Sequence, residues 1–316
     1  MSSSGETVVT SYTHEALFFD SSRALLQEAV PWLREGLQAG EAVALVCTED
    51  NNAALAAALG QDPRVLVLPR ARIYRKTVDA VAFYHDLVTA RVDAGQPRLR
   101  LVGEVGFDTG PQDRDEWRRF EAVCNHALAL MPLWSLCAYD THALPTPLLD
   151  AAQVTHPWLR AGGERARNGD FVDPARLLSG LTRPLEPPPA EASTITLTQP
   201  GELPDLRRWL QAGLVAAQVG TEAAEDAILA VNEVAANGLR HGRPPVQVTS
   251  WQTPTNVMCD ITDRGTGITD PLAGYTPPDP LQLLEGGAGL WMTRRLCHDV
   301  ATDRTPTGFT VRLTFA

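Results

Sequence analysis

Apolar stretches with the spacing of helices and of strands alternate along the first half of the chain. Residues 21–40 (SSRALLQEAVPWLREGLQAG) predict a helix that begins at Ser21 or Ser22 and stops at Gly40. The apolar run 42–48 (AVALVCT) then predicts a buried strand. Three more pairs of helix and strand follow, at 52–59 and 64–69, at 77–95 and 98–107, and at 114–131 and 133–140. This alternation predicts an open α/β sheet that is largely parallel and covered by helices on both faces.

The second half has a different pattern, in which strands and helices are grouped. A strand at 194–198 precedes helices near 203–218 and 222–241, and strands at 245–252 and 256–265 come next. After a loop, a helix at 289–297 leads to strands at 299–304 and 309–316 that form a closing hairpin. Elements grouped in this way predict an α+β two-layer sandwich with its helices on one face of the sheet.

A proline-rich segment separates the two halves. Residues 183–192 include four prolines within six positions, and proline stiffens the backbone toward polyproline II while it removes hydrogen-bond donors. We therefore expect an N-terminal domain at 1–182, a linker at 183–192 and a C-terminal domain at 193–316. The length of 316 residues is enough for two hydrophobic cores.

The overall composition excludes some classes of partner. The chain is 44% hydrophobic and 21% charged, with a formal net charge of -11 that repels a phosphate backbone. We therefore expect no direct nucleic-acid partner. The N-terminal residues have no basic segment that leads into a long apolar core, and no apolar run reaches the length that spans a bilayer. A cytoplasmic protein without a membrane partner is the expectation.

The cysteines and the single lysine argue against three kinds of site. The five cysteines form no CxxC pair, which indicates neither a disulfide framework nor a structural zinc site. Lys76 is the single lysine, and it does not follow a glycine-rich turn. A P-loop needs a lysine in that position to reach the phosphates, so the chain contains no P-loop.

Candidate chemistry is concentrated in the second half, first on the helix at 222–241. Glu233, Asn237 and His241 recur every four residues and fall within a stripe roughly 80° wide. The opposite face is predicted to be apolar through Ile228, Leu229, Val231, Val234 and Leu239. We interpret the polar stripe as one wall of a site; the alternative is the solvated side of an amphipathic helix.

Two glycine motifs follow that helix. Asp263 precedes Gly265 and Gly267 at the end of a strand, where glycines allow a tight turn and the carboxylate can accept a hydrogen bond from an exocyclic amine. The sequence GGAGL at 286–290 lies at the start of a helix, whose free N–H groups suit a phosphate. The roughly twenty residues between the motifs are rich in Pro, Gly and Asp and predict a mobile lid.

This order of motifs resembles the GHKL ATPases, and most closely their anti-sigma-factor serine-kinase branch, over residues 193–316. The Glu-x3-Asn helix, the Asp-x-Gly-x-Gly turn and the Gly-x-Gly-Leu helix start occur in the family's order. The resemblance implies a Bergerat ATP-binding fold in which Asn237 ligates Mg²⁺ and Glu233 is the general base for an acceptor hydroxyl. The implied cofactor-binding residues are Asn237, Asp263, Gly265, Gly267, Gly287, Gly289, Leu290 and Thr310.

Within the implied site, the adenine amine is received by Asp263. Gly265 and Gly267 shape the adenine pocket, whereas Gly287 and Gly289 hold phosphates beneath the lid. Turn initiation before a glycine is the structural alternative for Asp263, and it leaves the second glycine motif unexplained.

Other positions depart from the family or have a structural alternative. Only Thr310 of the family's Gly-Thr-Thr strand carries over, because the preceding residue is a phenylalanine. Arg294 or Arg295 is a candidate to neutralise the negative charge of the transferring phosphoryl group. The simpler interpretation is that both arginines lie on a solvated face of their helix. For His241 we favour a structural role at the helix C-terminus, with Gly242 as a left-handed cap. The chain has no histidine on a two-helix hairpin upstream of the ATPase-like region, which disfavours autophosphorylation of the two-component type.

Stretches of the first half, among them HEALFFDS, LVGEVGF and LCAYDTHALP, resemble the MEDS sensory domain over residues 12–160. That family is related to RecA/KaiC-like folds, so the resemblance implies such an open sheet without a P-loop and a sensory role. The polar residues that we single out near predicted strand ends, where open α/β sheets bind ligands, are His14, Glu104, Cys137, Asp140, His142 and His156. Their spacing matches no standard metal-ligand pattern, so turn capping is the first interpretation and a metal site the alternative. Cys47 and Cys137 are expected to be buried packing residues.

Together these expectations describe a bacterial signalling regulator. ATP and Mg²⁺ are the expected cofactors, and the γ-phosphate is expected to pass to a Ser or Thr of a small anti-anti-sigma (STAS) partner, with a sigma factor as a further partner. The alternatives are a non-catalytic nucleotide-gated switch that binds protein partners, and a kinase that acts on a His of a separate protein. The sequence leaves open the sensed signal, the partner's identity and the oligomeric state, a homodimer included.

Overall fold

The computed structural model describes residues 11–106, 111–181, 184–278, 288–305 and 308–315, with the side chains of 111–114 excepted. The chain divides into two compact units, Met1–Leu177 and Leu178–Ala316. Within the described segments, no helix combines the length and the hydropathy that a membrane crossing requires.

The first unit is built on a mixed, mostly parallel sheet. Its described strands lie in the order β3-β2-β4-β5-β1-β6-β7, and each neighbouring pair is parallel except β6 with β7. The bounds are β1 (Thr13–Phe19), β2 (Ala42–Val46), β3 (Val65–Val67), β4 (Leu99–Gly103), β5 (Leu133–Asp140), β6 (Trp158–Ala161) and β7 (Glu164–Arg167). The predicted, largely parallel α/β sheet is confirmed, and β1 and the antiparallel β6–β7 hairpin are additions to it.

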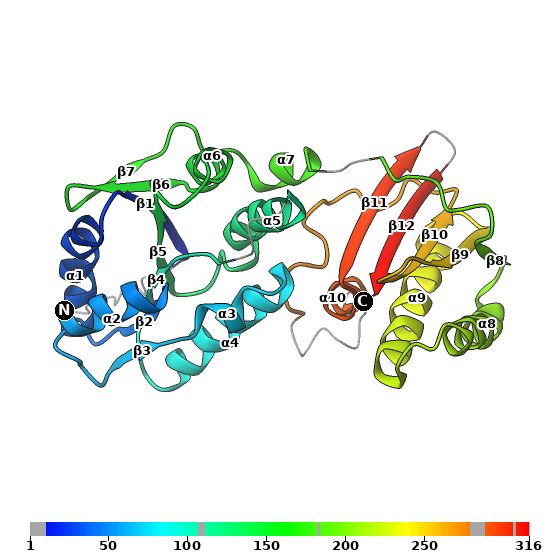
Figure 1. Ribbon diagram of the computed structural model, residues 1–316, viewed down its shortest axis with the longest axis horizontal. Helices are drawn as coiled ribbons and strands as arrows, with labels where there is room; N and C mark the ends of the chain where they lie inside the picture. The colour runs from blue at the N-terminus through cyan, green and yellow to red at the C-terminus, as the bar shows by residue number, and fades with distance from the viewer. Residues whose placement is uncertain (1–10, 107–110, 182–183, 279–287, 306–307, 316) are drawn as a thin grey trace, which may run out of the picture. The chain divides into compact units, whose positions relative to one another are not determined.

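Helices cover both faces of this sheet (Figure 1). They are α1 (Ser22–Gln38), α2 (Glu49–Ala58), α3 (Arg70–Ile73), α4 (Thr77–Asp93), α5 (Pro111–Ala127), α6 (Thr146–Thr155) and α7 (Pro174–Ser179). On one face, Leu33 of α1 and Leu55 of α2 pack with Leu45 and Leu136 of the strands. On the other face lie α4 and α5. Ser21 caps α1 through its hydroxyl, and Gly40 has a φ of 73°, as the predicted helix limits require.

The second unit is a two-layer arrangement of an antiparallel sheet and helices. Its described strands are ordered β11-β12-β10-β9-β8, and every neighbouring pair is antiparallel. The elements are β8 (Ser193–Leu197), the 3₁₀ turn η1 (Pro200–Glu202), α8 (Leu203–Ala216), α9 (Thr221–His241), β9 (Val246–Gln252), β10 (Val257–Asp263), α10 (Ala288–Leu296), β11 (Asp299–Thr305) and β12 (Gly308–Phe315). These bounds agree with the predicted elements.

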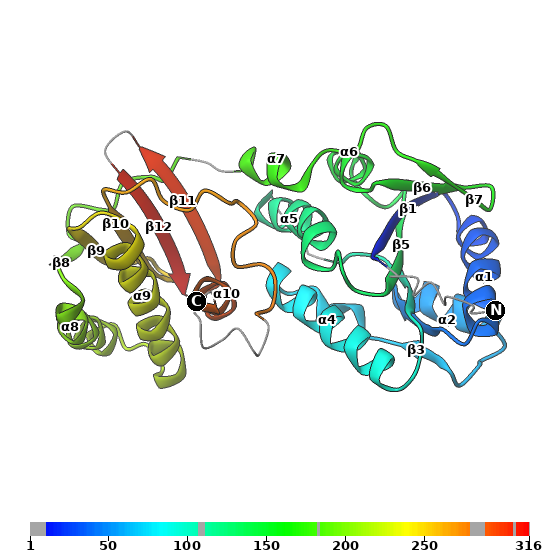
Figure 2. The ribbon, with the colours of Figure 1, turned by 180° about the vertical axis from the view of Figure 1, so that it is seen from behind.

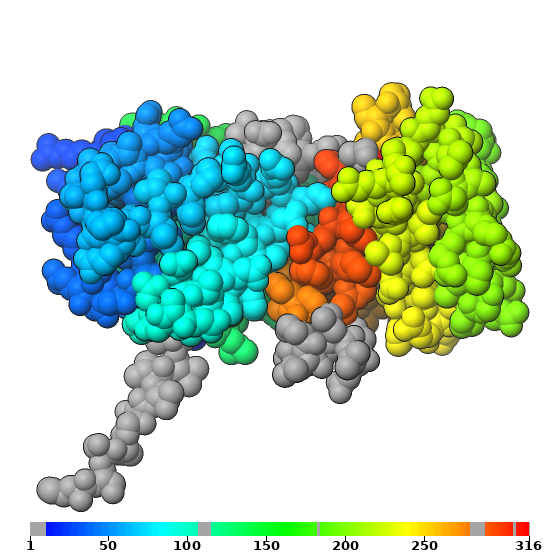
Figure 3. Space-filling model, turned by 90° about the horizontal axis from the view of Figure 1, so that it is seen from below, coloured from blue at the N-terminus to red at the C-terminus, as the bar shows by residue number. Residues whose placement is uncertain are grey.

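Among the described residues of the second unit, α8, α9 and α10 lie on one face of its sheet (Figures 1 and 2). Alternate residues of the central strands, such as Ile261 and Leu313, point to this layer and pack with Leu206, Ala227 and Val231 of α8 and α9. In the space-filling view, α8 and α9 (green to yellow) lie side by side on the surface of this unit (Figure 3). The helix that carries the polar stripe is therefore held between the sheet and its neighbours.

The proline-rich segment is attached to the second unit. The Leu185 N–H donates to Asp303 of β11 at 3.1 Å, and Arg312 of β12 donates to the Glu186 carbonyl at 2.7 Å. Arg312 also binds both carboxylate oxygens of the buried Asp260, each at 2.7 Å. Part of the expected linker therefore follows the sheet edge, an attachment that its composition does not predict.

Candidate functional site

The polar stripe of α9 meets the first turn of α10. Glu233 and Asn237 are both partly buried, and Gly289 lies against them. A Cβ built on Gly289 would be 2.9 Å from Glu233 Oε2 and 3.7 Å from Asn237 Nδ2. Because α10 begins at Ala288, its first N–H groups, which have no partner within the helix, start beside these two side chains. The structure thus brings a carboxylate, an amide and a helix N-terminus together.

The opposite face of α9 differs in part from its prediction. Val231, Val234 and Leu239 are buried as expected, and Ile228 packs at the edge of the core. Leu229 is 42% exposed, so its assignment to the apolar face is wrong. Small residues such as Ala227 make the central contacts instead, because they let α9 approach the sheet closely.

The C-terminus of α9 is shaped by Asp263. His241 is exposed in the last turn, but Gly242 has φ -86° and ψ -154°, so the predicted left-handed cap is wrong. A Cβ on Gly242 would lie 2.5 Å from the Gly238 carbonyl oxygen and 2.6 Å from Asp263 Oδ1. Glycine is needed here because the backbone passes directly against the carboxylate.

Asp263 is held at the end of β10 with 9% of its surface exposed. Its Oδ1 accepts the N–H of Gly265 at 2.5 Å and that of Arg243 at 3.3 Å. A Cβ on Gly265 would stand 2.6 Å from the same oxygen. Both of these hydrogen bonds end on Oδ1, so the carboxylate is oriented by the backbone of the two segments that flank it.

Gly267 and Phe309 form the next part of this wall. Gly267 has a φ of 70°, and a Cβ there would be 2.2 Å from the Phe309 ring. Phe309 is the strand partner of Asp263, whereas Thr310 pairs with Thr262 through hydroxyls 2.8 Å apart. Because side chains alternate across a strand, Thr310 lies on the opposite face of the sheet from Asp263. Phe309 was not predicted as a site residue, whereas its neighbour Thr310 was.

The second glycine motif is described only in part. Gly287 lies outside the described residues, and Gly289 and Leu290 lie in α10. Leu290 packs on Gly274, which has a φ of 77° and where a Cβ would be 2.6 Å from the leucine Cγ. The first residues of the expected lid therefore contact the helix that follows it.

Arg294 strengthens this contact. Its Nε donates to the Ala273 carbonyl at 3.2 Å, and its guanidinium carbon lies 4.0 Å from the centre of the Tyr275 ring. Tyr275 is 2% exposed. The solvated-face interpretation is therefore wrong for Arg294, which is partly buried, whereas Arg295 is exposed and lies over the Trp291 ring at 5.0 Å.

In the first unit, some of the selected polar residues cap turns. Glu104 accepts the Thr48 N–H at 2.8 Å and binds the Asn51 amide at 3.1 Å. Asp140 accepts the N–H of His142 at 2.8 Å, within the turn that follows β5. These contacts agree with the turn-capping interpretation.

The other three, His14, Cys137 and His156, meet in the interior of the first unit, together with Glu121. His14 is near the amino end of β1 and Cys137 is inside β5, so the expectation of a group at the carboxyl ends of the strands is wrong for them. Glu121 was missed, although the four-residue spacing of Glu121 and Asn125 places both on one face of their helix.

Burial dominates the acid–base behaviour of this group. Burial lowers the pKa of His156 to about 3, and His14 acts in the same direction. Burial raises the pKa of the Cys137 thiol well above its usual value. Burial also acts to raise the pKa of Glu121, but His156 and His14 together outweigh it and hold that pKa below its usual value.

Comparison with known families assigns both units. Residues 197–315 match the model of the histidine kinase-like ATPase domain, so the second unit contains a domain of that class. Residues 13–157 match the MEDS model, the methanogen/methylotroph DcmR sensory domain. The protein therefore combines a MEDS sensory domain with a histidine kinase-like ATPase domain.

A search of solved structures finds similarity to the RsbU and RsbW domains of Rv1364c from Mycobacterium tuberculosis. The sequence identity is 18% and the TM-score is 0.28. The similarity covers 39% of this chain and 32% of that chain, so this chain spans about a third of the length of the protein that it matches. No curated protein matches the chain.

Proposed function

We propose that the second unit is an ATP-dependent serine/threonine kinase domain of the anti-sigma-factor type, acting in the cytoplasm under the control of the MEDS domain. The observation that carries the proposal is the convergence of Glu233, Asn237 and Gly289 between α9 and α10. A carboxylate beside an amide, at a helix N-terminus, has the chemistry for binding a metal–phosphate group and for removing a proton.

The residues present fit ATP with Mg²⁺. Gly289 leaves open a space that a Cβ would fill, directly beside Glu233 and Asn237. Asn237 would hold Mg²⁺ through its amide oxygen, a ligand type that this hard cation accepts. When bound, Mg²⁺ would neutralise part of the charge on the phosphates. The second half has no lysine, so the N–H groups at the start of α10 are the groups proposed to bind phosphate oxygens.

Adenine is assigned to the wall formed by Asp263 and the turn after β10. The hydrogen bonds from Gly265 and Arg243 orient Asp263, and we assign its Oδ2 to the exocyclic amine of adenine. The Phe309 ring beside Gly267 gives this wall an apolar surface. Thr310 is left out of the proposed pocket because it lies on the other face of the sheet.

Glu233 is proposed to remove the proton of the acceptor hydroxyl as the γ-phosphoryl group is transferred. The acceptor is a Ser or Thr of a small anti-anti-sigma (STAS) partner, and the same domain binds a sigma factor. The motif order shared with the serine-kinase branch supports this acceptor.

Two measurements on the full chain test the proposal. Calorimetric titration with ATP, with and without Mg²⁺, is expected to show binding that Asn237→Ala weakens in the presence of Mg²⁺. Labelled ATP and a STAS partner are then expected to give acid-stable labelling of the partner. Glu233→Ala should retain ATP binding and lose transfer by at least about 100-fold.

Matched controls lie on the same helix. Glu225 is exposed on α9, so Glu225→Ala should transfer phosphate normally, and Asn232→Ala is the control for the amide. A folded wild-type chain that binds no adenine nucleotide contradicts the proposal. Binding without transfer, with partner affinity that changes with the nucleotide, indicates the non-catalytic switch, and an acid-labile product indicates a histidine acceptor.

A further inference from the structure

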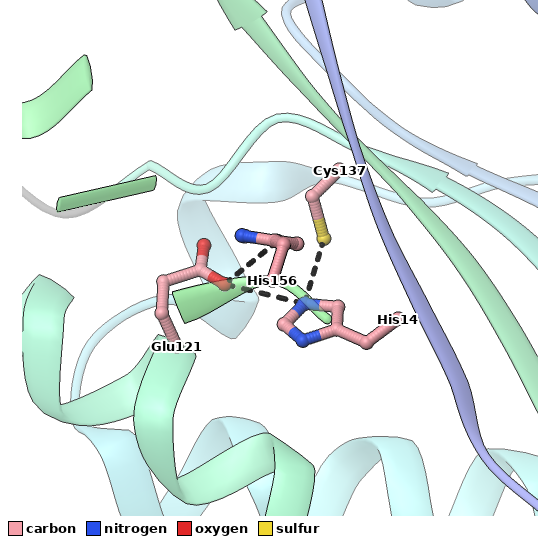
Figure 4. A group of neighbouring side chains, drawn as sticks. All are labelled: His14, Glu121, Cys137 and His156. Carbon is pink, nitrogen blue, oxygen red and sulfur yellow. Dashed lines mark hydrogen bonds and ion pairs between the residues drawn. The ribbon is translucent and has the colours of Figure 1, made fainter. Parts of the chain in front are cut away.

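Four side chains of metal-ligand type converge inside the MEDS domain. They come from four separate elements: His14 from β1, Glu121 from α5, Cys137 from β5 and His156 from the end of α6 (Figure 4). All four are buried, and one ligand atom from each lies within 4.8 Å of all the others. In a water-free interior, the polar atoms of such side chains normally have a hydrogen-bond partner or a bound ion.

The hydrogen bonds of His14 define its tautomer. The Asn125 amide nitrogen donates to the Glu121 carbonyl at 3.0 Å and to the Thr155 carbonyl at 2.8 Å. The atom of Asn125 that faces His14 Nδ1, at 3.1 Å, is therefore its oxygen, which can only accept. His14 Nδ1 is thus the protonated nitrogen, and in the neutral ring Nε2 carries a lone pair directed into the group.

His156 is oriented in the same way. Its Nδ1 lies 2.9 Å from the Ala152 carbonyl oxygen and donates to it. The Nε2 lone pair therefore also points into the group. An imidazole that donates one nitrogen to a carbonyl and offers the other to the centre is the arrangement found for metal-bound histidines, because the outer hydrogen bond aligns the ring.

Too few protons are available for the acceptors that meet here. The Tyr139 hydroxyl donates to Glu121 Oε1 at 2.6 Å, so its single proton is already used. Glu121 Oε2 is buried without a hydrogen-bond partner among the described residues, although it lies 3.3 Å from Nε2 of both His14 and His156. The Cys137 thiol lies 3.3 Å from His14 Nε2 and can donate its proton there. The lone pairs of Glu121 Oε2 and His156 Nε2 still face each other at 3.3 Å, and a cation between them would convert this repulsion into ligation.

The distances suit a tetrahedral ion. His14 Nε2 is 3.3 Å from Cys137 Sγ and 3.3 Å from Glu121 Oε2, and His156 Nε2 is also 3.3 Å from Glu121 Oε2. Zinc bonds of about 2.0–2.3 Å give a tetrahedron with edges of roughly 3.3–3.8 Å. Three of the six edges therefore already have nearly the right length, and the other three, which are at most 4.8 Å, would have to shorten by up to roughly 1 Å.

The charges balance for a divalent ion. A carboxylate and a thiolate together carry two negative charges, and the two imidazoles are neutral, so a divalent cation leaves no net charge in the interior. Binding would replace the proton on the Cys137 thiol, which would leave for solvent as the sulfur–metal bond forms.

We propose that His14, Glu121, Cys137 and His156 form a binding site for a divalent transition metal, and that Zn²⁺ matches its nitrogen, oxygen and sulfur ligands. A cavity of about 20 Å³ borders His14 and Cys137, which is room for one water-sized molecule.

The test uses the full chain and two metals. The purified protein is loaded with Zn²⁺, freed of excess metal and analysed by mass spectrometry, and one equivalent per chain is expected. The stripped protein is then loaded with Co²⁺, which should give visible bands of a tetrahedral site and a near-ultraviolet thiolate-to-cobalt band. Cys137→Ser should lose the thiolate band, and Glu121→Gln should weaken metal binding by at least about tenfold.

Cys124→Ser is the matched control, because Cys124 is also buried in α5 but is not one of the four ligands. It should retain the thiolate band, and Asn237→Ala in the other domain should retain the Zn²⁺. If Cys137→Ser does not fold, the cobalt spectrum of the wild type still decides. A folded wild-type chain that retains no Zn²⁺ and gives no thiolate–cobalt band overturns the proposal, and so does a thiolate band that persists in Cys137→Ser.

Discussion

Gly289 of α10 lies so close to Glu233 of α9 that a single added carbon atom would stand 2.9 Å from the glutamate Oε2. The contact joins the second glycine motif to the polar stripe, although the two positions are 56 residues apart in the sequence. The carboxylate is at the far end of a flexible side chain, so an added methyl group would displace it rather than disrupt the fold.

Gly289→Ala is therefore expected to separate activity from stability. Phosphotransfer should fall by about tenfold or more, because Glu233 is moved from its place, whereas the free energy of unfolding should change by less than about 1 kcal/mol. Gly213→Ala is the control, since Gly213 is exposed in α8 with open space around it and should gain about 0.5–1 kcal/mol from helix propensity. Kinetic assays and thermal unfolding of both variants make the comparison, and equal activity in the two variants would contradict it.

Gly267→Ala is expected to destabilise the ATPase domain. The residue has a φ of 70°, and a Cβ there would be 2.2 Å from the Phe309 ring. Backbone strain and overpacking together should therefore lower the free energy of unfolding by on the order of 3 kcal/mol. Gly163 is the control, because it has a φ of 79° but no atom near the position of a Cβ. Gly163→Ala should therefore lower the free energy of unfolding by only about 1 kcal/mol, from backbone strain alone. Calorimetry of the full chain measures both, and similar losses would show that the ring contact is unimportant.

Arg294→Ala is expected to loosen residues 268–278. The change removes the hydrogen bond to Ala273 and the contact of the guanidinium with Tyr275, which together are worth about 1–2 kcal/mol. Hydrogen exchange in this segment should become faster. Arg295→Ala, which removes a guanidinium that lies over Trp291 instead, should leave the exchange of this segment unchanged. Slow exchange in both variants would show that Arg294 does not hold the segment.

The cysteines are expected to resist alkylation in the native chain. All five are buried, and burial raises the pKa of Cys259 to about 12. At pH 8 only about one Cys259 in ten thousand is then the reactive thiolate. Iodoacetamide should modify none of the five thiols in native protein and all five in urea, as counted by mass spectrometry. Rapid modification of native Cys259 would show that its strand opens readily.

Several site residues could be predicted because their signals are local. The spacing of Glu233 and Asn237 on one helix and the glycines around Asp263 are visible within short windows, and the structure brings Glu233 and Asn237 to Gly289. The face of the sheet on which the Thr310 side chain lies could not be predicted in the same way. It depends on the register of β10 against β12, in which Phe309 and not Thr310 is opposite Asp263.

The sequence by itself determined the order of most helices and strands, the division into two unlike halves, and the two families that these halves match, whereas β1, α3, α6 and the β6–β7 hairpin were not predicted. The predicted features rest on hydrophobic periods, caps and motifs that act over a few residues. Tertiary structure alone decided that His14 meets Glu121, Cys137 and His156, because the packing of α5 and α6 against the sheet joins positions more than a hundred residues apart. Sequence patterns that span a few neighbouring residues do not show which distant residues come into contact.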